Sequence, residues 1–204
     1  FKQKMQENGY QKTIWSDDMS SGPFLTSEFA TEEELSLFDK LEAGDPATIT
    51  WFRSEQAKLS VKKPVTAFVS GVDRVFISSN IDWSGFQTNL GIWKYMGLLD
   101  NNVKPKPAFY TYKILVSKID GFKMVERLDE QTYKFSFANK NPVYILWNEQ
   151  GSMNKDLSKY ILMDKVTLTH IITQTGKTDK DAEINVVQTN SVLIDDVPIF
   201  IETS

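Results

Sequence analysis

Two groups of polar and aromatic residues each follow a short β-prone run, and both groups contain side chains able to do chemistry. They are Asp17 and Asp18, after residues 12–16, and Asn80, Asp82 and Trp83, after residues 72–77. Carboxylates serve as general acids, general bases or nucleophiles, and carboxylate and amide oxygens accept hydrogen bonds from hydroxyl groups. In sheets of parallel strands, function is found at the carboxyl ends of the strands. The spacing therefore indicates a candidate site at the ends of two strands.

The two adjacent acidic residues cannot form a catalytic pair with each other. Such a pair needs two carboxyl groups whose environments push their pKa values apart. Asp17 and Asp18 are neighbours, so on a strand their side chains point to opposite faces, and at most one of them faces a site. The alternative is that both, together with Ser20, only turn the chain after a strand. Asn80 and Asp82 have a similar alternative, which is that they cap a strand end.

A long helix at residues 46–70 must position the second group. Asp45 is a suitable N-cap, and the proline that follows it fits the first helical position. Apolar residues recur at i, i+3 and i+4 spacing, which predicts one buried face. Pro64 lies inside this pattern, so we expect a kink or an interruption just before it. Gly71 then turns the chain into a buried strand, and a helix that leads directly into such a strand is half of a parallel βαβ unit.

Two further helices are expected in the first half of the chain. Thr31 and Glu34 form an S/T-x-x-E capping box at the start of a helix that reaches Leu41. Another helix runs over residues 108–119 and ends at Gly121. The first half therefore predicts two successive β/α units.

Beyond Gly121 the period of the pattern changes from helical to alternating. Strands are expected at residues 133–137, 143–147, 166–173, 183–187, 191–194 and 199–202. Short strands at this spacing predict a small antiparallel β-sandwich packed on the α/β part. Its expected buried residues are Phe135, Tyr144, Leu146, Ile171, Val186 and Phe200.

Composition excludes several classes of function. Of the 204 residues, 41% are apolar and 12% aromatic, which is ample for a packed core, and the net charge of −4 without a basic stripe argues against nucleic acid as a partner. No apolar run is long enough to span a bilayer, and no signal-like segment is expected at the start. Without cysteine there are no disulfides, thiolate nucleophiles or Cys-ligated metals, and the lone His170 is expected to be structural. Gly22-Pro23 and Gly44-Asp45 indicate turns rather than phosphate loops, so no cofactor is expected.

Four stretches of the chain carry a family resemblance. They are Gln56-Ala57 followed by Gly71-Val72-Asp73-Arg74-Val75-Phe76 and Asp82-Trp83; Gly97-Leu98-Leu99-Asp100 followed by Lys106-Pro107-Ala108-Phe109-Tyr110-Thr111-Tyr112-Lys113; Pro142 to Trp147; and Val197 to Glu202. The first two resemble the last helix, strand and final helix of clan A (β/α)8-barrel glycoside hydrolases. The last two resemble strands of the C-terminal β domain of these enzymes. The resemblance implies the last strands and helices of a (β/α)8 TIM barrel over residues 1–121, followed by a β-sandwich domain over residues 122–204.

The same resemblance implies hydrolysis of O-glycosidic bonds by two carboxylates. It places residues 12–18 on the seventh barrel strand, where the family carries its nucleophile as Thr-Glu, so Asp18 is the expected catalytic residue. Aspartate is one methylene shorter than glutamate, and a retaining enzyme needs its two carboxyl groups about 5 Å apart. The fourth strand, where the family carries its acid/base as Asn-Glu, is not among the matched stretches. Asn148-Glu149 has the same letters, but we interpret it as a turn at a strand end.

The residues after the second strand are the expected substrate-binding residues. Asn80 and Asp82 would bind sugar hydroxyl groups, and Trp83 would stack on the C–H face of a sugar ring. The alternative for Trp83 is a place in the core, which is the commoner fate of tryptophan and the one expected for Trp15.

Two functional interpretations follow. In the first, the chain is the C-terminal portion of a glycosidase that acts on oligosaccharide or polysaccharide. In the second, it is a pseudo-enzyme, or a glycan-binding or assembly module that kept the scaffold, and aspartate in place of glutamate at position 18 favours this. In both, carbohydrate is the expected partner and the expected location is extracellular or at the cell surface. A (β/α)8 barrel needs about 250 residues, so the missing N-terminal part, in the same precursor or another chain, is expected to complete it.

Overall fold

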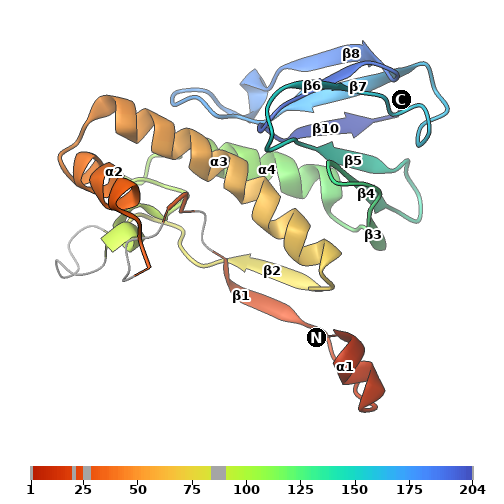
Figure 1. Ribbon diagram of the computed structural model, residues 1–204, viewed down its shortest axis with the longest axis horizontal. Helices are drawn as coiled ribbons and strands as arrows, with labels where there is room; N and C mark the ends of the chain where they lie inside the picture. Colours follow the sequence, from red (N-terminus) through yellow and green to blue (C-terminus); the bar gives the residue numbers. More distant parts are fainter. Residues whose placement is uncertain (1, 20–21, 25–28, 84–90, 204) are drawn as a thin grey trace.

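The computed structural model describes residues 2–19, 22–24, 29–83 and 91–203. After a short first helix come two parallel strands, which two longer helices separate in the chain, and an antiparallel sheet makes up the second half. Figure 1 shows helix α3 (Pro46–Val69) and helix α4 (Pro107–Ile119) side by side, between the parallel pair and the antiparallel sheet. The two helices therefore form a central layer that carries a sheet on either side.

The remaining helices are short, and α2 and η2 each begin at a capping box. Their bounds are α1, Lys2–Glu7; α2, Glu32–Glu42; and the 3₁₀ turns η1, Gly91–Tyr95, and η2, Asp179–Asp181. The capping box before α2 is confirmed, since Glu34 N donates to Thr31 Oγ1 at 3.2 Å and Thr31 N donates to Glu34 Oε2 at 2.9 Å. At the start of α3, Thr48 N donates to Asp45 Oδ2 at 2.8 Å. The sequence therefore predicted these helix starts correctly.

Helix α3 runs continuously through Pro64, so of the expected kink or interruption the interruption is wrong. Proline removes one backbone hydrogen bond, from its own missing N–H to the carbonyl four residues earlier. Pro64 is itself buried, and Phe52, Val61 and Val65 of the same helix are buried with it. Burying each large apolar side chain contributes about 1.5–3 kcal/mol, and this outweighs the lost hydrogen bond.

The first two strands pair in parallel. Strand β1 (Trp15–Met19) lies beside strand β2 (Arg74–Ile77), with Trp15 opposite Arg74. β1 begins later than the expected run of residues 12–16, so the two aspartates lie inside the strand and do not follow it. The register shifts between Ser16 and Met19, so the irregularity of the strand lies where the two aspartates stand.

Six strands of the second half form one antiparallel sheet in the order β3-β4-β5-β10-β7-β8. Their bounds are Met124–Arg127, Thr132–Ser136, Val143–Leu146, Ile199–Glu202, Lys165–His170 and Ile184–Gln188, and β6 (Met153–Lys155) pairs separately with β9 (Val192–Ile194). The expected strands are all present within a few residues. β3 and β6 were not expected, because each is short and has no buried residue.

The two faces of this sheet contribute to different cores. On one face, Phe135 and Phe200 pack with Val61 of α3 and Leu115 of α4. On the other, alternate residues of the same strands pack with the β6–β9 pair and the loop before β7. The predicted burial is confirmed for Phe135, Tyr144, Leu146, Ile171 and Phe200. It is wrong for Val186, whose side chain is 69% exposed on the edge strand β8.

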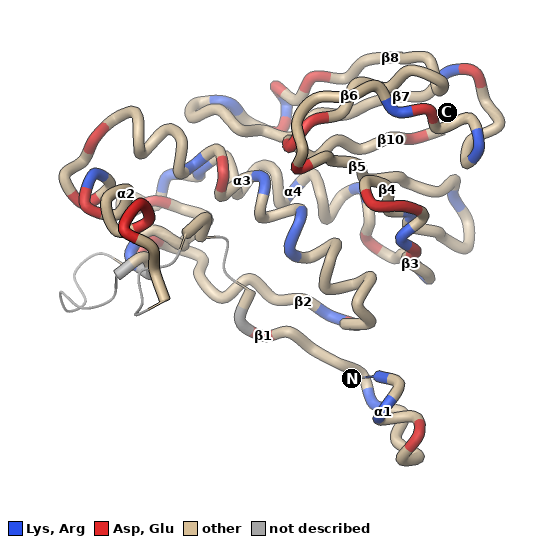
Figure 2. Tube along the Cα trace, viewed as in Figure 1, with Lys and Arg blue, Asp and Glu red and all other residues tan. Residues whose placement is uncertain are grey.

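The observed architecture is thus an α/β part followed by a β-rich part. The expected β-sandwich is not established, because the second face is covered by a two-stranded pair and not by a full sheet. Two parallel strands do not establish a partial TIM barrel either. Acidic and basic residues are interspersed along the described chain (Figure 2). In the part of the chain that the structure describes, no helix is long and apolar enough to cross a membrane.

Candidate functional site

The parallel pairing of β1 and β2 directs both strands toward the same edge. Asp18 is the fourth residue of β1, and the side chain of this residue lies outside the described part of the structure. Asp17 is exposed on the same strand. Because Met19 lies opposite Ile77, the last residue of β2, the chain leaves β1 and β2 at the same level. The segment that follows β2 therefore begins next to the segment that contains Asp18.

The chain after β2 remains extended and pairs with a second segment of backbone. Leu99 N donates to the carbonyl of Asn80 at 2.8 Å, and Asp82 N donates to the carbonyl of Leu99 at 2.9 Å. The side chain of Asn80 is exposed, and that of Trp83 is 46% exposed. Asp82, between them, is largely buried. Of the three expected binding residues, two therefore face solvent and one faces the protein.

The carboxylate of Asp82 forms a buried ion pair with Lys106, the residue before α4. Lys106 Nζ lies 2.7 Å from Asp82 Oδ1, and the two side chains are 3% and 8% exposed. The ammonium also donates to the carbonyl of Tyr95 at 2.8 Å, and Gly97 N donates to Asp82 Oδ1 at 2.9 Å. The pair therefore ties the chain after β2 to the start of α4.

Burial shifts both members of this pair away from their charged forms. Desolvation raises the pKa of Asp82 even though the Lys106 ammonium works to lower it. Desolvation likewise lowers the pKa of Lys106, and the Asp82 carboxylate opposes that shift. Each charge is thus tolerated only because the other is present. Sequence reasoning singled out Asp82 for its place after a strand, whereas its partner 24 residues later carries no local signal.

Gly97 and Gln56 fix the loop of residues 95–97, against which Asp82 packs. A Cβ atom on Gly97 would lie 2.2 Å from Asp82 N, so only glycine permits this approach of the two backbones. The buried Gln56 of α3 donates from Nε2 to the carbonyls of Tyr95 and Gly97, both at 3.2 Å. This contact links the central helix to the loop, and neither residue was predicted to take part in the site.

Helix α2 is joined to the same loop by polar contacts. The Tyr95 hydroxyl donates to Glu42, and Lys94 Nζ lies 2.7 Å from the other carboxylate oxygen. Burial raises the pKa of Tyr95, and the hydrogen bond to Glu42 adds to this effect. Burial alone would raise the pKa of Glu42, but the hydrogen bonds from Lys94 and Tyr95 hold it below its ordinary value.

The side chain of Trp15 lies on the surface, which corrects the expectation that it is part of the core. It is 57% exposed, and its ring lies 5.7 Å from that of Phe76 on the neighbouring strand. The guanidinium of Arg74 lies over the ring at 5.3 Å. Phe76, Ile81 and Trp83 are also exposed. The parallel pair and the segment after β2 thus present several large apolar side chains to solvent.

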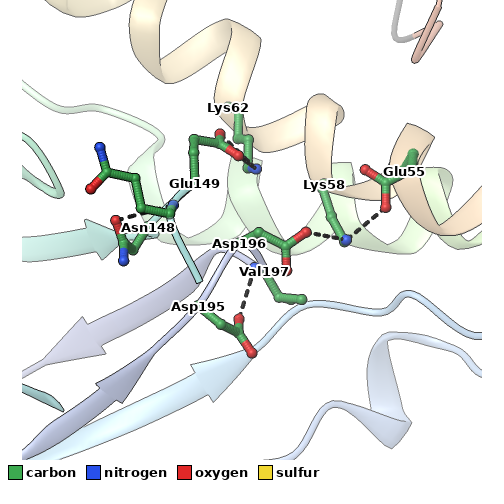
Figure 3. Close-up of polar contacts among 9 residues, drawn as sticks. Glu55, Lys58, Lys62, Asn148, Glu149, Asp195, Asp196 and Val197 are labelled. Carbon is green, nitrogen blue, oxygen red and sulfur yellow. Dashed lines mark hydrogen bonds and ion pairs between the residues drawn. The ribbon is translucent and has the colours of Figure 1, made fainter. Parts of the chain in front are cut away.

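The Asn148-Glu149 dipeptide lies at a turn after β5, as expected (Figure 3). Asn148 Nδ2 donates to the carbonyl of Gly151 at 2.7 Å, and Glu149 forms an ion pair with Lys62 of α3 at 2.8 Å. A neighbouring ion pair joins Lys58 of α3 to Asp196. Figure 3 shows that these contacts link the central helix to loops of the antiparallel sheet, so the Glu149 carboxylate has a structural partner.

Within the described residues there is no group of three or more His, Cys, Asp or Glu side chains that could hold a metal ion. No protein-family model matches the chain, and no curated protein does either. Among solved structures, the chain is similar to a GH39 enzyme from Xanthomonas axonopodis pv. citri, with a TM-score of 0.39 and 10% sequence identity over 97% of this chain and 56% of that one. The chain thus spans little more than half the length of that enzyme. A likeness of this size establishes neither a shared fold nor a shared activity.

Proposed function

We propose that the chain is the C-terminal portion of a glycoside hydrolase-like protein, with the candidate site at the shared edge of β1 and β2. The observation that supports this most is the parallel register. It brings the end of β1, with Asp18, level with the end of β2, after which Asn80 and Trp83 follow. A carboxylate, an amide and an indole ring carried by neighbouring segments are a combination suited to sugar hydroxyl groups and C–H faces.

In this proposal Asp18 is the nucleophile and the second carboxylate comes from protein outside this sequence. A retaining mechanism requires the two carboxyl groups about 5 Å apart. Asp82, first considered as a sugar ligand, has a different role here. Its ion pair with Lys106 fixes the segment that carries Asn80 and Trp83, so it positions these two side chains.

The proposal also requires further strands beside the parallel pair. Parallel strands are normally buried on both faces, and two strands alone do not make a stable sheet. Among the described residues each strand of the pair has one neighbour, and Trp15 and Phe76 are 57% and 43% exposed. We therefore propose that protein outside this sequence completes the sheet. In this arrangement residues 1–121 belong to the completed α/β unit and residues 122–204 form the second domain.

The alternative is a glycan-binding or assembly module without catalysis. It is favoured by the aspartate at position 18, whose shorter side chain holds its carboxylate farther from a substrate than glutamate would. Under this alternative the chain retains exposed aromatic side chains that can contact a sugar, namely Trp15, Phe76 and Trp83, but has no working nucleophile.

Hydrolysis of chromogenic aryl glycosides by the purified protein, together with its completing partner if one copurifies, tests the proposal. Asp18→Asn keeps size but removes the nucleophilic charge, so kcat should fall by several orders of magnitude with little change in stability. Asp17→Asn is the matched control and should retain the rate. Equal losses in both variants would contradict the assignment of Asp18. Binding of glycans without hydrolysis would favour the alternative, and neither binding nor hydrolysis would overturn both.

A further inference from the structure

A separate pocket lies between helix α2, the first half of α3 and the loop that leads into α4. Its volume is about 190 Å³, smaller than sites that hold drug-sized ligands. The apolar part of its wall comes from Leu41, Ile49 and Phe52, and the polar part from Arg53, Asp82, Asp100, Asn101, Asn102 and Lys106. Among the described side chains, neither Asn80 nor Trp83 lines it, so it lies apart from the exposed side chains of the candidate catalytic edge.

The charges around this pocket balance. Arg53 and Lys106 are cationic, and Asp82 and Asp100 are anionic. Lys106 is paired with Asp82, whereas Arg53 makes no hydrogen bond or ion pair within the described part of the chain. An anion would meet two carboxylates here, and a cation would meet a guanidinium. The electrostatics therefore favour an uncharged ligand.

Several hydrogen-bonding groups of the wall are still available to a ligand. The Oδ1 atom of Asp82 accepts from Gly97 N and from Lys106, and the Oδ1 atom of Asp100 accepts from Asn102 N and Lys104 N, both at 2.9 Å. The Oδ2 atom of each carboxylate has no hydrogen-bond donor among the described residues. The guanidinium of Arg53 brings five N–H donors to the same space. Residues with free donors and free acceptors thus line one small cavity.

The turn that carries Asp100 to Asn102 is held in a strained conformation. Val103, which follows, has φ +60°, and a β-branched residue rarely adopts this left-handed region. Hydrogen bonds from Asn102 N and Lys104 N to the Asp100 carboxylate secure the turn. The polar wall is consequently fixed in place before any ligand arrives, which lowers the entropic cost of binding.

We propose that this pocket binds a single uncharged polyhydroxy ring, such as one sugar unit. A hydroxyl group donates one hydrogen bond and accepts others, so neighbouring hydroxyls satisfy Arg53 and the two carboxylates together. The apolar wall suits the C–H face of the ring. The proposal does not depend on hydrolysis at Asp18, because the two sites share no ligand-contacting residue.

Titration of the ¹⁵N-labelled protein with glucose, galactose, mannose, xylose and myo-inositol, followed by heteronuclear NMR, tests the proposal. At least one compound should shift the Arg53 Nε–H and the Asn101 and Asn102 amide signals. Arg53→Gln removes the charged donor and should weaken binding about tenfold, whereas Arg74→Gln on β2 is the matched control and should leave it unchanged. Asp18→Asn should also retain binding, which separates this site from the proposed catalytic one.

Three results would overturn the inference. One is the absence of shifts at these signals up to tens of millimolar of every compound. Another is a response to acetate or sulfate alone, which would show an anion site. The third is equal weakening by Arg53→Gln and Arg74→Gln. The first two are read on the unmodified protein, so they hold even if a variant fails to fold.

Discussion

Replacing Lys106 by methionine tests whether the buried ion pair holds the loop after β2. The substitution keeps a long flexible side chain and removes the ammonium that lies 2.7 Å from Asp82 Oδ1. Asp82 is 8% exposed, so its carboxylate would remain buried with one hydrogen-bond donor among the described residues, Gly97 N. An uncompensated buried charge is far more costly than an unpaired exposed one.

The expected loss in the free energy of unfolding is about 3–5 kcal/mol for Lys106→Met. For a chain of this size that corresponds to a melting temperature lower by roughly 6–20 °C. Lys94→Met is the matched control, because Lys94 and Glu42 are also 2.7 Å apart but are 25% and 34% exposed. That pair should contribute only about 0–1 kcal/mol.

Chemical denaturation followed by tryptophan fluorescence, at several pH values, provides the measurement. In Lys106→Met, burial raises the pKa of Asp82 and the opposing ammonium is gone. The folded state then binds a proton more readily than the unfolded state, so the variant should regain stability as the pH falls through that pKa. The double variant Asp82→Asn/Lys106→Met should recover most of the loss, because no charge is left buried.

A loss for Lys106→Met no larger than that for Lys94→Met would refute the reasoning. It would show that water reaches Asp82 or that the loop rearranges at little cost. Failure of the double variant to recover stability would contradict the electrostatic explanation, and would indicate that packing of the lysine stem dominates.

Three other predictions concern separate parts of the fold. Phe200→Ala should cost roughly 3–5 kcal/mol in denaturation, since its ring is fully buried between the sheet and the helices, and a loss below about 1 kcal/mol would contradict that packing. Gly97→Ala should destabilise the protein by roughly 1–3 kcal/mol, because the new Cβ meets backbone atoms at 2.2 Å, and an unchanged melting temperature would show that the loop can move. Burial works to raise the pKa of Asp129, but hydrogen bonds from Lys155, Tyr160 and Gln131 N hold it below its ordinary 3.8. Its stabilising contribution should therefore be present above pH 3.8 and lost as the pH falls further, and Asp129→Asn should flatten that part of the pH–stability curve.

Several helix boundaries could be predicted because their causes lie within a few residues. The Thr31–Glu34 box and the Asp45 cap satisfy backbone donors of the first helical turn, and both are present in the structure. The interruption expected at Pro64 was wrong because its cause does not lie within a few residues. Whether a helix continues through a proline depends on what its neighbouring turns bury, and those contacts come from distant parts of the chain.

Alternation in the β-rich half predicted which residues share a face of a strand, but not which faces are covered. Phe135 and Phe200 are buried because α3 and α4 lie over their strands, whereas Val186 is exposed on an edge strand. The position of Trp15 was missed in the same way, since a tryptophan in a β-prone run gives no indication of whether anything packs on it. Whether a side chain is buried depends on which element packs over it, and the tertiary fold decides that.

The sequence by itself determined most of the order of elements, most helix starts, and the approximate place of Asp18, Asn80 and Trp83 near the ends of β1 and β2. Only the tertiary structure brought Asp82 to Lys106, and Arg53 to Asp100 across the small pocket. The reason is physical: caps, turns and alternation act over a few residues and leave a local pattern. Ion pairs and pockets join residues tens of positions apart, so they exist only once the chain has folded.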